Sequence, residues 1–140
     1  MGEITYQTNM ASEFYVLSAL ARLGADASLT LGNKKSVDIV IIRPDFGTST
    51  IDVKGLAGKN DWILGDSPLS KNANHYYLLL TFDGKITDLN NVPRIWIIPA
   101  KKIVSFIKTS ANQKTKYVSR KTIREQAAEY ENAWDLLKAI

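Results

Sequence analysis

One strongly apolar run in the 140-residue chain, residues 37–42, consists of valines and isoleucines around a single aspartate, Asp38. β-Branched residues favour strands, so we predict a strand at Ser36–Ile42 that ends at Arg43-Pro44, because proline breaks the hydrogen-bonded ladder. The run is far shorter than the roughly 18 apolar residues of a membrane-spanning helix, so we expect no membrane span. A charge embedded in so apolar a strand requires a partner or a metal ion.

The rest of the pattern predicts a first helix, followed by a meander of three strands in which the strand at Ser36–Ile42 is the middle one. Two more strands and two helices then follow. Apolar residues at helical spacing favour a helix at Thr8–Leu23, with Thr8 or Asn9 as its cap and Gly24 at its end. The other strands are predicted at Ala27–Leu31, Ser49–Lys54, Tyr76–Phe82 and Arg94–Ile98, and the later helices at Ala100–Lys108 and Ser119–Lys138. Gly55 is expected to stop the third strand, Asp83-Gly84 marks a turn, and residues 56–74 should form a long loop with at most one helical turn.

Element order and composition predict a single α/β domain over residues 1–140, with one mixed sheet of about five strands flanked by helices. Hydrophobic residues make up 45% and charged residues 23%, the balance of a soluble globular protein, and we expect no signal peptide. The lack of cysteine excludes disulfides, thiolate metal sites and cysteine nucleophiles, and it suits a cytoplasmic protein. The lone histidine, His75, argues against a zinc site or a Ser-His-Asp triad. Catalysis would therefore use carboxylates, lysines, hydroxyls and a hard cation.

The third predicted strand carries two charged residues on one face. Side chains alternate along a strand, so Ile51 and Val53 point one way while Asp52 and Lys54 point the other. If the second and third strands form a hairpin, paired residue numbers sum to 91, and Asp38 lies across from Val53. A bulge or a shift of one residue would bring the carboxylates of Asp38 and Asp52 together.

Two adjacent carboxylates repel each other, and a divalent cation removes that conflict. We expect Mg²⁺ or Mn²⁺ to bind Asp38 and Asp52 with the Val53 carbonyl, leaving room for a phosphate oxygen. Lys54 would then orient or activate the attacking water. Glu13, at the edge of the apolar face of the first helix, would support the water network or a second ion. These residues predict a site that cleaves phosphodiester bonds.

An acid-x-Lys string is weak evidence alone, because Asp83-Gly84-Lys85 matches it too. The first match gains weight from its order: a helix with Glu13, an apolar strand with Asp38, then Asp52-Val53-Lys54 ended by Gly55. This order resembles the PD-(D/E)xK nuclease superfamily, which includes restriction endonucleases and archaeal Holliday-junction resolvases. The resemblance implies a restriction-endonuclease-like core, Mg²⁺-dependent hydrolysis of DNA that leaves a 5′-phosphate, and a homodimer. The helix that follows the motif in that family is weak here.

Positive charge is concentrated late in the chain, since residues 101–124 contain no acid while the whole chain carries +4. Such a stretch predicts contacts to a phosphate backbone, with a solvated surface whose acidic partners lie elsewhere in the fold as the alternative. Trp62 would stack on a base, or else anchor its loop on the core. The candidate nucleic-acid-binding residues are Lys71, Trp62, Lys101, Lys102, Lys114, Lys116 and Arg120.

Two alternatives to an active nuclease remain open. The first is a catalytically inactive module of the same fold that binds nucleic acid or a protein partner. The second is a small hydrolase or a structural protein in which Asp52 and Lys54 form an ion pair on the sheet. The ion pair predicts that Asp52→Asn and Lys54→Ala each destabilise the fold, whereas a catalytic site predicts lost cleavage with little loss of stability.

Overall fold

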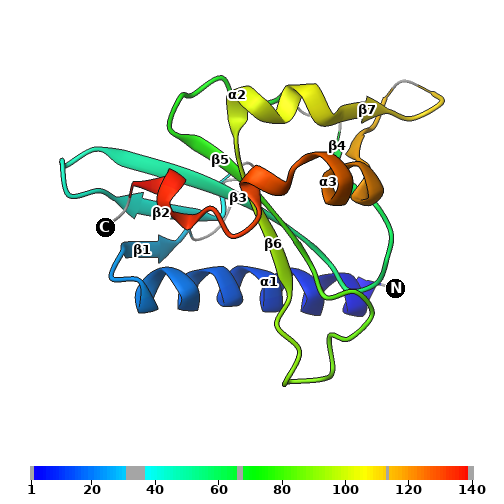
Figure 1. Cartoon of the computed structure of the whole chain (residues 1–140), viewed down its shortest axis with the longest axis horizontal. Coiled ribbons are helices and arrows are strands. Elements are labelled where there is room, and N and C mark those ends of the chain that lie inside the picture. Colours follow the sequence, from blue (N-terminus) through cyan, green and yellow to red (C-terminus); the bar gives the residue numbers. More distant parts are fainter. Residues whose placement is uncertain (1, 31–36, 66–67, 113, 139–140) are drawn as a thin grey trace.

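The centre of the fold is a five-stranded mixed sheet, seen in a computed structural model that describes residues 2–30, 37–65, 68–112 and 114–138 (Figure 1). Its strands lie in the order β1-β2-β3-β5-β6 and span Asp26–Leu29 (β1), Ile39–Ile42 (β2), Thr48–Leu56 (β3), His75–Thr81 (β5) and Arg94–Pro99 (β6). β1, β2 and β3 form an antiparallel meander, β5 is parallel to β3, and β6 is antiparallel to β5. The predicted meander and the mixed sheet of about five strands are confirmed, although Ser36 and Leu31 lie outside the described residues.

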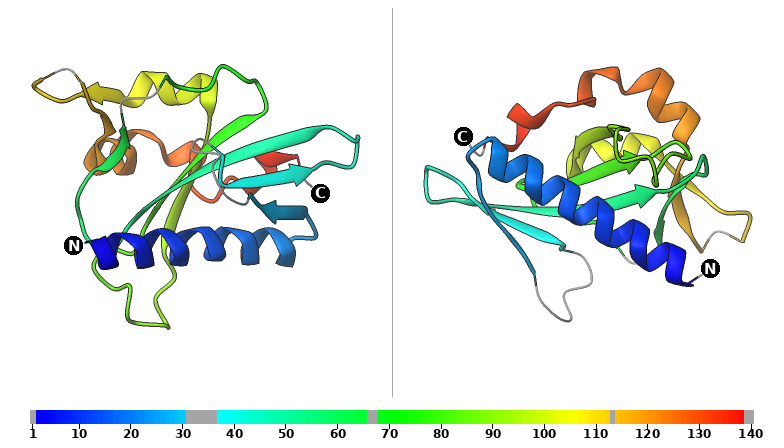
Figure 2. Two further views of the ribbon diagram at one scale, coloured as in Figure 1. Left: turned by 180° about the vertical axis from the view of Figure 1, so that it is seen from behind. Right: turned by 90° about the horizontal axis from the view of Figure 1, so that it is seen from below.

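Helix α1 (Gly2–Arg22) covers one face of this sheet and runs across its strands (Figure 2). Val16 and Leu20 pack there in one core cluster with residues of the five-stranded sheet. The helix begins at Gly2 and not at Thr8, because apolar periodicity marks only the part of a helix that contacts a core. Gly24 follows it with a positive φ of 88°, as predicted. Neither α1 nor any other helix in the described part of the chain is long and apolar enough to cross a membrane.

A second, three-stranded sheet lies on the other side, and its strands were not predicted. The strands β4 (Trp62–Gly65), β8 (Lys116–Val118) and β7 (Ile107–Thr109) pair antiparallel in that order. The predicted long loop over residues 56–74 is therefore wrong, and its described residues contain β4 and no helix. The predicted helix at Ala100–Lys108 is also too long, since α2 (Ala100–Ile103) and the 3₁₀ turn Val104–Phe106 give way to β7.

The predicted C-terminal helix at Ser119–Lys138 is wrong beyond its first two turns. Ser119 caps α3 (Arg120–Gln126) by accepting a hydrogen bond from the Thr122 N–H, and the 3₁₀ turns Ala128–Tyr130 and Trp134–Leu137 follow. The helix stops because the next residues bind the edge of β6. Glu131 forms a β-bridge with Trp96, and its carboxylate accepts two hydrogen bonds from Arg94, at 2.8 and 3.0 Å. These tertiary contacts outweigh the helical periodicity.

Gly55 does not stop β3, contrary to the prediction, because it pairs with Leu80 and the strand continues to Leu56. Its role is to let α1 approach, since a Cβ at this position would overlap the Ser12 hydroxyl oxygen.

We therefore expect Gly55→Ala to lower the free energy of unfolding by roughly 1–3 kcal/mol, the usual cost of overpacking. Urea denaturation measures this effect. Gly58→Ala is the matched control, because a Cβ there meets nothing within 4 Å. Equal stability of the two variants would contradict this account of the α1–β3 contact.

Candidate active site

The candidate site lies where β3 extends past β2. The β2–β3 ladder pairs Ile42 with Thr48 and ends at Ile39 and Ile51, whereas β3 continues along β5 to Leu56. Within the described part of the chain, residues 52–56 of β3 thus pair with β5 at one edge and with no strand at the other, which we call the open edge of β3. Paired numbers sum to 90 and not to 91, so the register brings Asp38 beside Asp52. This is the shift of one residue that unites the two carboxylates.

Asp38 is held at this open edge by hydrogen bonds of its backbone and its carboxylate. Its N–H donates to the Ile51 carbonyl at 2.7 Å, and its own carbonyl accepts from the Thr30 N–H at 2.9 Å. Its carboxylate oxygen Oδ2 accepts from the Val53 N–H at 2.7 Å, in the place that a strand carbonyl would take. The N–H and carbonyl of a strand residue point to the same edge, so the Val53 carbonyl also faces this gap. The carboxyl groups of Asp38 and Asp52 also form a hydrogen bond, which adds to the rise of the Asp52 pKa.

Asp52 is 8% exposed, and its Oδ1 lies 3.6 Å from Lys54 Nζ. Burial raises the pKa of Asp52 to about 7; the charge of Lys54 opposes this rise, and Asp38 adds to it. A nearby ammonium normally holds a carboxyl well below its ordinary pKa. Here the pKa of Asp52 is raised, so the attraction of Lys54 does not offset the cost of burying the Asp52 carboxylate beside Asp38. An additional positive charge at the site would reduce that cost.

Glu13 of α1 is half-buried, and the charges of Asp38 and Lys54 act on its pKa as well. Burial raises its pKa, Asp38 raises it further, and Lys54 lowers it. The structure thus brings Glu13, Asp38, Asp52 and Lys54 into one electrostatic neighbourhood. Among the described residues, no three His, Asp or Glu side chains form a ready metal cluster. A cation here would depend on two carboxylates, a backbone carbonyl and water, which is the donor set that Mg²⁺ accepts.

The neighbouring strand β5 contributes residues that sequence reasoning missed. Tyr77 is paired with Asp52, and His75 with Thr50, whose hydroxyl lies 2.7 Å from His75 Nδ1. His75 is 2% exposed; burial lowers its pKa, and Asp38 opposes that shift. Burial raises the pKa of Tyr77, and Asp52 adds to the rise. Only the parallel pairing of β3 with β5 reveals these neighbours, and no local sequence pattern signals it.

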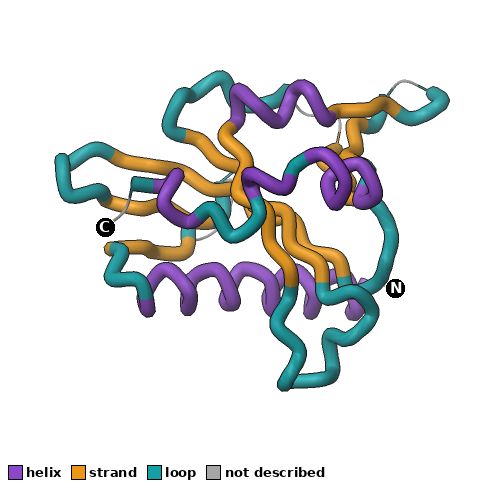
Figure 3. The backbone as a smooth tube through the Cα atoms, viewed as in Figure 1, coloured by secondary structure: helices purple, strands orange, loops and turns teal. Residues whose placement is uncertain are grey.

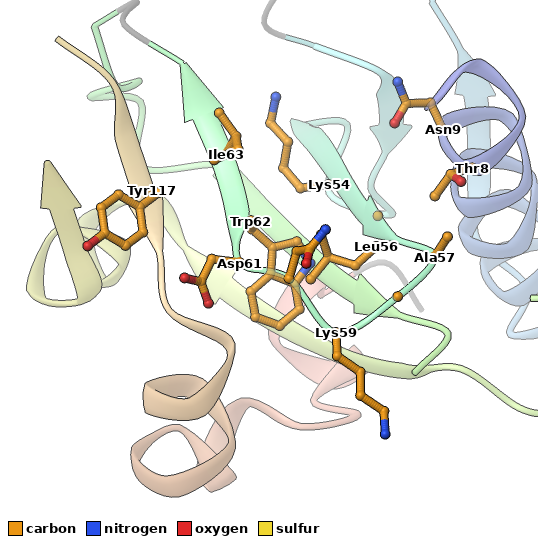
Figure 4. Close-up of a pocket in the computed structure, with 13 residues that line it drawn as sticks. Thr8, Asn9, Lys54, Leu56, Ala57, Lys59, Asp61, Trp62, Ile63 and Tyr117 are labelled. Atoms are coloured by element: carbon orange, nitrogen blue, oxygen red, sulfur yellow. The ribbon is translucent and has the colours of Figure 1, made fainter. Parts of the chain in front are cut away.

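An open groove of about 970 Å³ leads away from Lys54 (Figure 4). Lys54 and Leu56 of β3 lie between its two walls. Thr8 and Asn9 of α1 form one wall, and Ile63 of β4 and Tyr117 of β8 belong to the other. The open part of β3 therefore borders a surface large enough to receive an extended ligand.

Two of the predicted nucleic-acid contacts have structural roles. Trp62 is 1% exposed and its Nε1 donates to the Leu80 carbonyl at 3.0 Å, so its ring is not available for stacking. The Arg120 guanidinium forms an ion pair with Asp83 at 2.6 Å. Asp83 lies outside the basic stretch, so for Arg120 the alternative of an acidic partner elsewhere in the fold is confirmed. The remaining candidates are exposed or half-buried, namely Lys71, Lys101, Lys102, Lys114 and Lys116. Lys71 follows Ser70, whose N–H donates to the Tyr77 hydroxyl.

No protein-family model matches this chain, and no curated protein matches it in sequence. Among solved structures, it is similar to a bacterial homing endonuclease, I-Ssp6803I, with a TM-score of 0.64 and 13% sequence identity. The similarity covers 96% of this chain and 93% of that one. The chain therefore shares, over nearly its whole length, the fold of a bacterial homing endonuclease.

Proposed function

We propose that the protein is a Mg²⁺-dependent endonuclease of the PD-(D/E)xK type that hydrolyses DNA. The observation that carries the proposal is the meeting of Asp38 and Asp52 beside Lys54 at the open edge of β3, with the Asp52 pKa raised to about 7. A buried acid pair of this kind is expensive to maintain without a cation. The shared fold of a homing endonuclease supports the same activity.

The carboxylates of Asp38 and Asp52 and the Val53 carbonyl would hold Mg²⁺ or Mn²⁺. When bound, the cation stabilises the negative charge that develops on the phosphate and acidifies water. Lys54 orients the attacking water and offsets the charge of the transition state, while Glu13 accepts hydrogen bonds from the surrounding water. The water oxygen bonds to phosphorus as the P–O3′ bond breaks. The products are a 5′-phosphate and a 3′-hydroxyl, which takes up a proton.

We also propose that the active form is a homodimer. One chain of 140 residues covers little DNA, and a single site cuts one strand. Two copies related by a twofold axis would place one site on each strand.

Incubation with labelled duplex, branched, flapped and single-stranded DNA tests the proposal, in Mg²⁺, in Mn²⁺ and in a chelator. We expect metal-dependent cleavage by the wild type and far slower cleavage by Lys54→Ala. Binding of DNA without cleavage in any metal would favour the inactive module. Equal cleavage by Lys54→Ala would place the active site elsewhere.

A further inference from the structure

We propose that the three-stranded sheet is a docking surface for duplex DNA, with the β7–β8 ribbon entering a groove of the duplex beside the phosphate that Lys54 receives. This inference rests on the proposed function and adds the surface that recognises the substrate. The ribbon extends from the body of the protein (Figures 1, 2 and 3), and its two strands pair antiparallel.

The register of the small sheet separates two faces. Trp62, Val118 and Ile107 form one row, and this row packs in the core cluster beneath the sheet. Ile63, Tyr117 and Lys108 form the next row. Because side chains alternate along a strand, this second row points away from the core. We call these three residues the outer row.

The outer row is continuous with the candidate active site. Ile63 is 58% exposed although it is a large apolar residue, Tyr117 is half-buried and Lys108 is exposed. Ile63 and Tyr117 line the same groove as Lys54 (Figure 4). A ligand that reaches Lys54 along this groove therefore contacts the outer row.

The charge of this region fits a polyanion. Residues 100–118 contain no Asp or Glu and include five lysines, Lys101, Lys102, Lys108, Lys114 and Lys116. The groove itself contains Lys54 and Lys59. Its acid, Asp61, already accepts a hydrogen bond from the Arg120 N–H at 2.9 Å. Of the lysines in and beside the groove, Lys54 and Lys59 line it and Lys108 belongs to the outer row. These three cations fit a polyanion that lies between the outer row and Lys54.

The shape of the surface favours a duplex over a single strand. A two-stranded β-ribbon fits the major groove of B-form DNA, which is about 12 Å wide. Single-strand binding would instead require exposed aromatic rings for base stacking. In the three-stranded sheet Trp62 is buried, and Tyr117, the aromatic residue of the outer row, is half-buried. Neither ring is fully exposed for stacking on bases.

Fluorescence anisotropy with labelled duplex DNA tests the inference, with Lys54→Ala as the parent so that cleavage does not interfere. We expect Tyr117→Ala and Lys108→Ala each to lower the duplex affinity by roughly 5- to 10-fold, and Lys108→Ala to reduce the salt-dependence slope by about one. Arg22→Ala is the charge-matched control, because Arg22 lies roughly 20 Å along α1 from Asn9. It should change the affinity less than twofold. Circular dichroism verifies that each variant is folded.

The outcomes separate this inference from the proposed function. If the wild type cleaves DNA but the outer-row variants bind duplex as tightly as their parent, the docking surface is wrong and the nuclease stands. If no metal supports cleavage but duplex affinity depends on Tyr117 and Lys108, the docking surface stands alone. Equal or tighter binding of single-stranded DNA would overturn the ribbon-in-groove arrangement.

Discussion

Lys54→Ala is expected to lower the single-turnover rate of DNA cleavage by roughly 10²- to 10⁴-fold, the loss typical of a positioned catalytic group. Its ammonium lies beside Asp52 at the mouth of the groove, where an attacked phosphate would sit. Asp38→Asn should cause a loss of similar size, because the amide removes half of the carboxylate pair. Duplex affinity should fall far less than the rate, since the groove and the outer row are unchanged.

The sequence supplies its own control for Lys54. Lys85 ends the second acid-x-Lys string, Asp83-Gly84-Lys85, and the structure places that string in a turn in which Asp83 and Gly84 have positive φ. Asp83 is engaged with Arg120 rather than with an open strand edge. Lys85→Ala should cleave within twofold of the wild-type rate. A comparable loss in Lys54→Ala and Lys85→Ala would show that positive charge alone, and not the site, supports cleavage.

Asp52→Asn is expected to raise the free energy of unfolding at pH 8, the opposite of what a structural ion pair predicts. The Asp52 pKa is about 7 in the folded chain and 3.8 as the unperturbed value, so the folded state binds its proton more tightly. The carboxyl favours folding below pH 3.8, and this contribution is lost as the pH rises through about 7. Asparagine removes the titration. The free energy of unfolding of Asp52→Asn, relative to that of the wild type, should therefore rise by roughly 1–3 kcal/mol between pH 5 and pH 8, given about 1.4 kcal/mol per pKa unit.

Urea denaturation at pH 5 and pH 8 without divalent cations measures this difference. Asp45→Asn is the matched control, because it makes the same substitution at an exposed carboxylate in the β2–β3 turn. A destabilised Asp52→Asn at pH 8 would support the ion pair of Asp52 and Lys54 as a structural feature. It would leave the carboxylate pair without a functional explanation.

The sequence predicted the parts of the fold that have strong local patterns. The packed half of α1 and the five central strands show periodicity in consecutive residues, and so their positions were found. The strands β4, β7 and β8 contain three or four residues each and are defined by pairs such as Trp62 and Val118, far apart in the chain. The last helix was overextended because the contacts of Glu131 with β6 are invisible to helical spacing.

The candidate site divides in the same way. Asp52 and Lys54 share a face because alternation is a local property, and the hairpin brought Asp38 within one residue of its observed partner. Tyr77 and His75 were missed because β5 reaches β3 through a parallel crossover whose register no turn specifies. For Trp62 the sequence left base stacking and anchoring of the loop on the core as alternatives, and the burial of its ring beside β8 confirms the anchoring role.

Isothermal titration of Mn²⁺ into the wild-type chain, Asp38→Asn and Asp52→Asn tests the central claim, that the two carboxylates at the open edge of β3 form a metal site. We expect saturable binding by the wild type, loss of that binding in both variants, and retained binding in Asp45→Asn. No saturable binding by the folded wild type, or binding that survives both substitutions, would contradict the claim.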